Sequence, residues 1–200
     1  MSTRNQPLAI KTTQKSGSWR SGWLSGFATL LLASSLAFAG SVAAQTGHWV
    51  GTWATSADIA GEPFDNQTLR QIVYVSVGGN RVRVRFSNLF GEGPLEIASA
   101  SIAVPAAGPA IVPGTLEPLT FGGEPSVTIA AGAKALSDPM DFDLAATSTV
   151  AVTLYVASPT VAPTVHSRSH QTNYVSPPGD FTDSDVMPVA QEVLSWFWLS

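Results

Sequence analysis

Alternation of apolar and polar residues with a period of two is the feature that most constrains this sequence. The alternation is clearest in the stretch RQIVYVSVGGNRVRVRFSN, residues 70–88. The alternating positions are Val73, Val75 and Val77, followed by Arg81, Arg83 and Arg85 interleaved with Val82, Val84 and Phe86. A period of two places successive side chains on opposite faces of a β-strand. Because Gly78-Gly79-Asn80 separates the two halves, the stretch predicts a β-hairpin.

Similar short segments recur along the rest of the chain, and proline or glycine interrupts almost every gap between them. The segments predicted as strands are 49–55, 95–104, 119–121, 126–129, 149–156, 164–174 and 194–199. Two others, 130–136 and 189–194, are the candidates for a turn or two of helix. Seven to nine short antiparallel strands with little helix predict an all-β chain, specifically a β-sandwich of jelly-roll type.

The first 44 residues have the pattern of a secretory signal peptide. Four basic residues precede an apolar run over 23–39, and the small residues Val42-Ala43-Ala44 follow it. This order predicts cleavage after Ala44, with Ala39 as a second possible site and an uncleaved membrane anchor as the alternative. We therefore expect residues 45–200 to form one secreted or periplasmic domain that has no membrane association after cleavage.

Charge and cysteine content narrow the function classes further. Residues 45–200 keep six of the ten basic residues and all 14 acidic residues, a formal charge of −8. Nucleic-acid-binding domains carry a basic face, so nucleic acid is not expected as a partner. The chain has no cysteine, which excludes a disulfide scaffold, and its stability must come from a hydrophobic core.

The sequence contains no recognisable catalytic or metal-binding motif. It lacks a Gly-x-Ser-x-Gly elbow and has no cysteine nucleophile. On one straight strand His166 and His170 would lie about 13 Å apart, too far to share a zinc ion. The acidic run at residues 180–185 has oxygen donors but lacks the glycine and distal glutamate of an EF-hand, which favours a solvated turn. We predict neither a metal nor a cofactor.

Two sets of residues are candidates for ligand binding. Trp49 and Trp53 share one strand face, and Trp196 and Trp198 share another; exposed tryptophan rows stack on sugars, whereas buried rows fill β-sandwich cores, the commoner case. The arginines at 81, 83 and 85 could hold an anionic polysaccharide through bidentate contacts to carboxylates. The favoured alternative is cross-strand pairing with Asp141 and Asp143.

Several segments resemble one known family. They are WVGTWATS at 49–56, TLRQIVYVSVGGNRVRVRFSNLFGEGPLEIASASIAV at 68–104, AIVPGTLEPLTFGGEPSVTIAAGAKALSDPMDFDL at 110–144, HSRSHQTNYVSPPGDF at 166–181, and SWFWLS at 195–200. In this order they resemble the N-terminal β-rich region of secreted bacterial SGNH (GDSL-type) esterases. The resemblance covers essentially all of residues 45–200.

The resemblance implies a β-domain that precedes a catalytic ester-hydrolase domain. The family's Gly-Asp-Ser and Asp-x-x-His blocks do not occur here; Gly179-Asp180 is followed by Phe181. We therefore expect a chain truncated before the catalytic domain and inactive alone, with that missing domain as its partner covering the apolar faces of SWFWLS. The alternatives are a stand-alone carbohydrate-binding module with a polysaccharide ligand, and a structural domain that packs against another protein.

Overall fold

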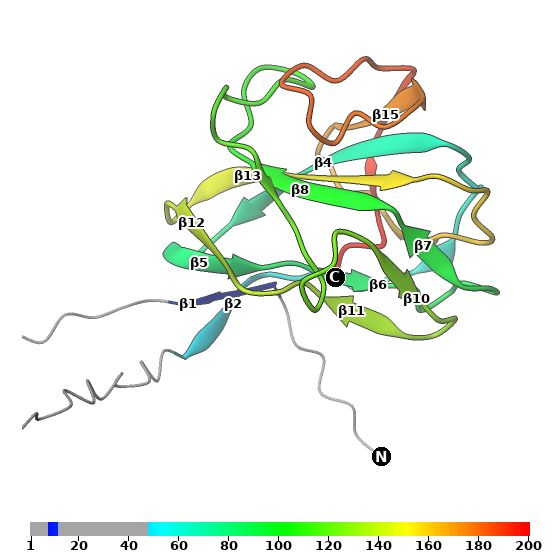
Figure 1. Ribbon diagram of the computed structural model, residues 1–200, viewed down its shortest axis with the longest axis horizontal. Helices are drawn as coiled ribbons and strands as arrows, with labels where there is room; N and C mark the ends of the chain where they lie inside the picture. The colour runs from blue at the N-terminus through cyan, green and yellow to red at the C-terminus, as the bar shows by residue number, and fades with distance from the viewer. Residues whose placement is uncertain (1–7, 12–47) are drawn as a thin grey trace, which may run out of the picture.

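A computed structural model describes residues 8–11 and 48–200 (Figure 1). All regular elements in these residues are β-strands, and every strand pair is antiparallel. The predicted all-β class is therefore confirmed. Apart from β1 (Leu8–Lys11), the predicted signal peptide lies outside the described residues. The described residues include no helix with the length and apolar character needed to cross a membrane.

The largest sheet has six strands in the order β16–β15–β4–β13–β8–β9. Their bounds are β16 (Gln191–Val193), β15 (Asn173–Pro178), β4 (Gln67–Val75), β13 (Ser148–Val156), β8 (Ser99–Ala103) and β9 (Glu117–Pro118). The nine-residue strands β4 and β13 pair along their whole length and form the centre of the sheet. Both contain the valine, isoleucine and threonine residues that favour strands.

Four smaller sheets complete the fold of the described residues, and the one that contains β5 lies below the large sheet in the view of Figure 1. One consists of β12 (Met140–Leu144), β5 (Gly79–Arg83), β1 and β2 (Trp49–Trp53), in that order. Another consists of β17 (Ser195–Phe197), β14 (Thr164–Ser167) and β3 (Ile59–Ala60). Two pairs complete the set: β10 (Val127–Ile129) with β7 (Leu95–Ile97), and β11 (Lys134–Leu136) with β6 (Arg85–Ser87). The jelly-roll order of strands stays a prediction.

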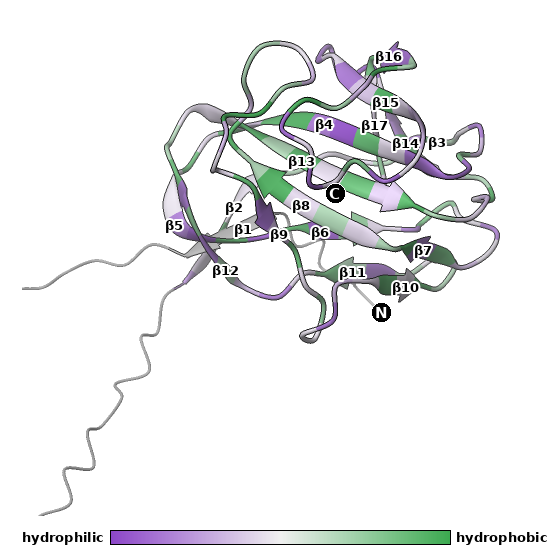
Figure 2. Ribbon diagram, turned by 45° about the horizontal axis from the view of Figure 1, so that its top comes forward, coloured by the Kyte–Doolittle hydropathy of each residue, from purple (hydrophilic) through white to green (hydrophobic). Residues whose placement is uncertain are grey.

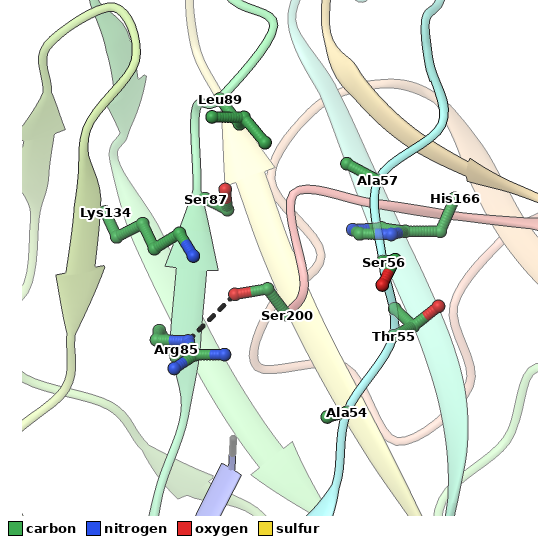
Figure 3. A pocket seen from close by; sticks show the side chains of 10 residues that line it. All are labelled: Ala54, Thr55, Ser56, Ala57, Arg85, Ser87, Leu89, Lys134, His166 and Ser200. Carbon is green, nitrogen blue, oxygen red and sulfur yellow. Dashed lines mark hydrogen bonds between the residues drawn. The ribbon is translucent and has the colours of Figure 1, made fainter. Parts of the chain in front are cut away.

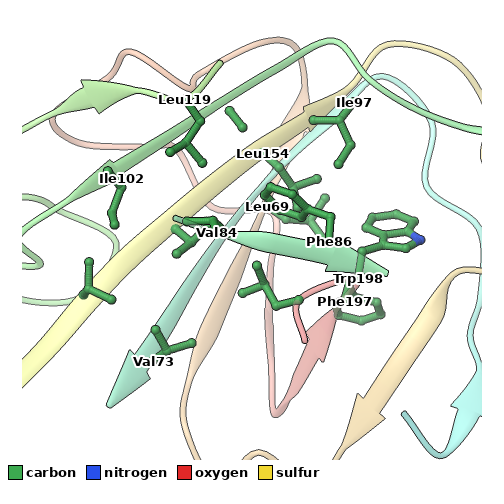
Figure 4. Packing of buried hydrophobic residues seen from close by; sticks show 14 of the residues in the cluster. Leu69, Val73, Val84, Phe86, Ile97, Ile102, Leu119, Leu154, Phe197 and Trp198 are labelled. Atoms are coloured by element: carbon green, nitrogen blue, oxygen red, sulfur yellow. The ribbon is translucent and has the colours of Figure 1, made fainter. Parts of the chain in front are cut away.

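The main hydrophobic core lies between the large sheet and the smaller ones. From the large sheet come Leu69, Val73, Val75, Val150, Val152, Leu154, Ala100 and Ile102, and from the opposite side Val82, Val84, Phe86, Leu95, Ile97, Ile129, Phe142 and Leu144. Figure 4 shows Leu69, Leu154 and Phe86 close together in this core, with Trp198 beside Phe86. Of the alternating valines of residues 70–88, Val73, Val75, Val82 and Val84 are buried in this one core, whereas Val77 is exposed.

A second, smaller core covers the outer face of the large sheet. Ile72 of β4 and Ala151 of β13 pack there against Ile111 and Met187, which come from long connecting segments. Figure 2 shows a hydrophilic stretch within β4, which contains Arg70, a residue on this outer face with 0% exposure. The large sheet is therefore covered on both faces, and the charged side chain of Arg70 is buried beneath the segments that cover the outer face.

The predicted hairpin over residues 70–88 is wrong, although both of its strands exist. Strand β4 pairs with β13 and β15, whereas β5 pairs with β1 and β12 in another sheet. Gly78 does not form a primed turn; it has no positive φ, and a Cβ there would lie 2.5 Å from the carbonyl oxygen of Leu144. Alternation determines which face of a strand is buried, but it does not determine the strand's neighbour.

Other boundaries also differ from the predictions. The stretch 95–104 divides into β7 and β8, and 164–174 divides into β14 and β15 around Arg168 and His170, both with positive φ. The two predicted helical segments contain strands instead, β11 in 130–136 and β16 in 189–194. Apolar runs this short cannot be assigned by periodicity alone, and pairing with a neighbouring strand decides them.

The apolar end of the chain packs inside this domain. Phe197, Trp198 and Leu199 all belong to the main core, and Trp198 has 0% exposure. Phe64 contacts both aromatic rings, at 4.7 Å from Phe197 and 5.6 Å from Trp198 between ring centroids. The expectation that another domain covers these side chains is therefore wrong, because the domain's own residues cover them.

Candidate functional site

The four tryptophans proposed as sugar contacts do not form an exposed row. Trp198 is buried in the main core, and the other three are half-buried. Trp53 and Trp196 pack edge to face with ring centroids 5.1 Å apart, and the Trp196 indole donates a hydrogen bond to the carbonyl of Ile72 at 2.9 Å. Trp49 lies beneath the guanidinium of Arg83 at 5.6 Å. These contacts favour the packing role over a flat sugar-stacking surface.

The three alternating arginines occupy three different environments. Arg81 forms the expected cross-strand ion pair, with its Nε 3.0 Å from Oδ1 of Asp141, although the angle is not that of a hydrogen bond. Arg83 donates to the carbonyl of Ser137 at 2.9 Å and covers Trp49. Arg85 instead lies in a pocket of about 550 Å³. A continuous arginine ladder along a polymer is therefore not formed.

The pocket around Arg85 is the candidate functional site (Figure 3). Its lining residues are Ala54, Thr55, Ser56, Ala57, Arg85, Ser87, Leu89, Lys134, His166 and Ser200. Figure 3 shows Arg85 and Lys134 on one side, His166 and the 54–57 segment on the other, and Ser200 between them. Two lining residues are cationic, none is acidic, and four carry hydroxyl groups.

Strand alternation explains why these side chains meet. On β6, Phe86 points into the core with 0% exposure, so Arg85 and Ser87 point to the opposite side. Lys134 pairs with Ser87 in the register of β11 and β6, which puts it beside them. On the other edge of β6, the amide of Ser200 donates to the carbonyl of Arg85 at 3.1 Å.

Arg85 is buried without an anionic partner among the described residues. It is 8% exposed, and its Nε donates to Oγ of Ser200 at 2.9 Å. Its two terminal nitrogens form no hydrogen bond with the described part of the chain, and no described carboxylate forms an ion pair with it. Burial lowers the pKa of Arg85. Burial also lowers the pKa of Lys134, and the positive charge of Arg85 adds to that shift.

His166 is the most deeply buried titratable group of the site, with 2% exposure. Neither ring nitrogen makes a hydrogen bond within the described residues. Burial lowers the pKa of His166, while main-chain groups of Ser56 and Leu199 lie close enough to oppose that shift without forming good hydrogen bonds. A neutral imidazole therefore lies in the wall of the pocket.

The serines and the histidine of this pocket do not form a hydrolytic triad. His166 makes no hydrogen bond with any described serine hydroxyl. The nearby carboxylate of Asp58 accepts hydrogen bonds from the hydroxyl and, at 3.0 Å, the amide of Ser167, and these contacts lower the pKa of Asp58. A triad needs a hydroxyl hydrogen-bonded to the base and a carboxylate hydrogen-bonded to its other nitrogen. Both connections are missing here.

Sequence analysis identified Arg85 as a binding candidate but did not identify the pocket. Lys134, Ser200 and the 54–57 segment come from distant parts of the chain, and no motif connects them. The one available signal was the face of β6, because an arginine two residues before Ser87 must share its side of the strand. No family model and no curated protein matches the chain.

Proposed function

We propose that this chain is the non-catalytic β-domain of a secreted SGNH (GDSL-type) ester hydrolase, and that it is inactive alone. The resemblance of residues 45–200 to that region of the family motivates the proposal. Its structural support is a single observation: His166, the buried histidine in the candidate pocket, has no hydrogen bond to a serine hydroxyl or a carboxylate among the described residues. An acyl-transfer site requires those connections.

The proposal is tested by assaying the purified chain with p-nitrophenyl acetate and longer acyl esters. We expect no turnover above the rate of buffer alone, because no described serine hydroxyl is hydrogen-bonded to His166. The decisive comparison uses Ser56→Ala, Ser200→Ala and His166→Gln. Saturable hydrolysis that any of these substitutions abolishes would show an active catalytic centre and refute the proposal.

The alternative is a carbohydrate-binding module. The tryptophans do not support it, because Trp53, Trp196 and Trp198 pack against other side chains of the domain. One observation does favour a ligand-binding role. The pocket around Arg85 offers an unpaired guanidinium and several hydroxyl groups in one cavity. The chemistry of that pocket defines a ligand class and does not depend on the esterase assignment.

A further inference from the structure

No carboxylate among the described residues forms an ion pair with Arg85. A buried ion is costly unless it is paired and hydrogen-bonded, and proteins rarely leave one alone. Arg85 is 8% exposed, and its one described side-chain partner is the neutral hydroxyl of Ser200. Arg81, by contrast, has Asp141 beside it on a more exposed part of the surface. Arg85 therefore presents a charge whose partner must come from outside the described residues.

The unsatisfied side of Arg85 is the side that recognises oxyanions. A guanidinium offers parallel N–H groups that match the two oxygens of a carboxylate or phosphate, and its Nε is already held by Ser200 at 2.9 Å. The side chain is thus oriented before a ligand arrives, which reduces the entropic cost of binding. Lys134 places a second positive charge in the same wall, and the described lining residues include no acidic side chain that would repel an anion.

The rest of the pocket suits a ligand with hydroxyl groups. Thr55, Ser56, Ser87 and Ser200 contribute hydroxyls, and a cavity of about 550 Å³ lies within the range of small-molecule sites. His166 lies in the wall beside these hydroxyls, with both ring nitrogens buried and without a hydrogen bond among the described residues. A hydroxylated ligand would satisfy groups that a bare inorganic ion leaves unpaired.

We propose that the pocket formed by Arg85, Lys134, His166 and Ser200 binds a small acidic sugar, whose carboxylate or phosphate contacts the guanidinium of Arg85. The sugar hydroxyls then contact the serine and threonine side chains of the wall. Sugar acids and sugar phosphates share this chemistry, and direct titration separates them.

The test is isothermal titration of the full chain with glucuronate, glucose 6-phosphate, glucose and inorganic phosphate, at fixed pH and ionic strength. We expect saturable binding of one or both charged sugars, and at least about tenfold weaker binding of glucose, because only the charged sugars pair with Arg85. A preference for glucuronate identifies a sugar acid as the ligand, and a preference for glucose 6-phosphate identifies a sugar phosphate.

Arg85→Gln and Arg81→Gln form a matched pair of variants, since each removes one arginine charge from strands that are consecutive in sequence. We expect Arg85→Gln to weaken binding by at least about tenfold and Arg81→Gln to change it by less than about twofold. Lys134→Gln, at an exposed position, should weaken binding severalfold. It provides the measurement if Arg85→Gln fails to fold, as judged by circular dichroism.

Three results would overturn the proposal. One is no binding of either charged sugar at millimolar concentration. Another is equal binding of glucose and its charged analogues, or of inorganic phosphate and glucose 6-phosphate, because the site would then not require both charge and hydroxyls. The third is equal loss of affinity in Arg81→Gln and Arg85→Gln, which would indicate general surface electrostatics.

Discussion

Arg70 holds two long connecting segments against the outer face of the large sheet. Its Nη1 donates to the carbonyl of Pro109 at 2.6 Å, and its Nη2 donates to the carbonyl of Ser184 at 2.7 Å. Its Nε donates to Oγ1 of Thr153 at 3.0 Å, on the neighbouring strand β13. Burial lowers the pKa of Arg70, although the charge of Asp185 opposes that shift. The segments it joins cover the second hydrophobic core.

We predict that Arg70→Met lowers the free energy of unfolding by about 4 kcal/mol. Each hydrogen bond from a charged donor contributes roughly 1.5–3 kcal/mol, and each buried acceptor left unpaired costs about 1–3 kcal/mol. Three such bonds would add up to more than this value, but removing the buried charge also removes its desolvation cost, which offsets part of the lost hydrogen-bond energy. The remaining loss is a large fraction of a typical total of about 5–15 kcal/mol.

Urea unfolding followed by tryptophan fluorescence measures this difference, and Arg81→Met is the control. Arg81 belongs to a partly exposed ion pair, so its loss should cost less than about 1 kcal/mol. Hydrogen exchange should also show faster exchange at residues 105–112 and 180–186 in Arg70→Met alone. The reasoning is refuted if the free energy of unfolding of Arg70→Met lies within about 1 kcal/mol of the unsubstituted protein and the amides of both segments stay equally protected. The hydrogen bonds of Arg70 would then not hold the two segments against the sheet.

Two further predictions concern His166 and Gly78. Burial lowers the pKa of His166 in the folded state, so below the usual histidine pKa of about 6.5 the unfolded chain binds more protons than the folded one. The free energy of unfolding should therefore fall on acidification, by up to about 1.4 kcal/mol per pH unit. Urea unfolding from pH 7.5 to 5 should show a shallower fall in His166→Gln; an equal slope in both proteins would refute this origin. Gly78→Ala should cost about 1–3 kcal/mol, since its Cβ would meet the carbonyl oxygen of Leu144, whereas Gly93→Ala has open space and should be nearly neutral; equal melting temperatures would contradict this.

The sequence by itself determined several of the strands and which of their faces are buried. Val82, Val84 and Phe86 were predicted on one face and are all buried, because side chains in a strand must alternate whatever the strand pairs with. Pairing of Arg81 with Asp141 also followed from alternating charges on two segments. The buried face of a strand is a local feature, and local periodicity carries it.

The tertiary structure decided the pairing of strands and the environment of each polar side chain. Residues 70–88 run through three sheets, and Val73, Val75, Val82 and Val84 still face one core, an arrangement that alternation leaves open. The apolar end around Trp198 fills that same core. Arg81 and Arg85 have the same spacing and chemistry in sequence, yet one meets a carboxylate and the other a pocket. The physical reason is that a side chain's neighbours come from segments distant in sequence, and only the folded chain brings them together.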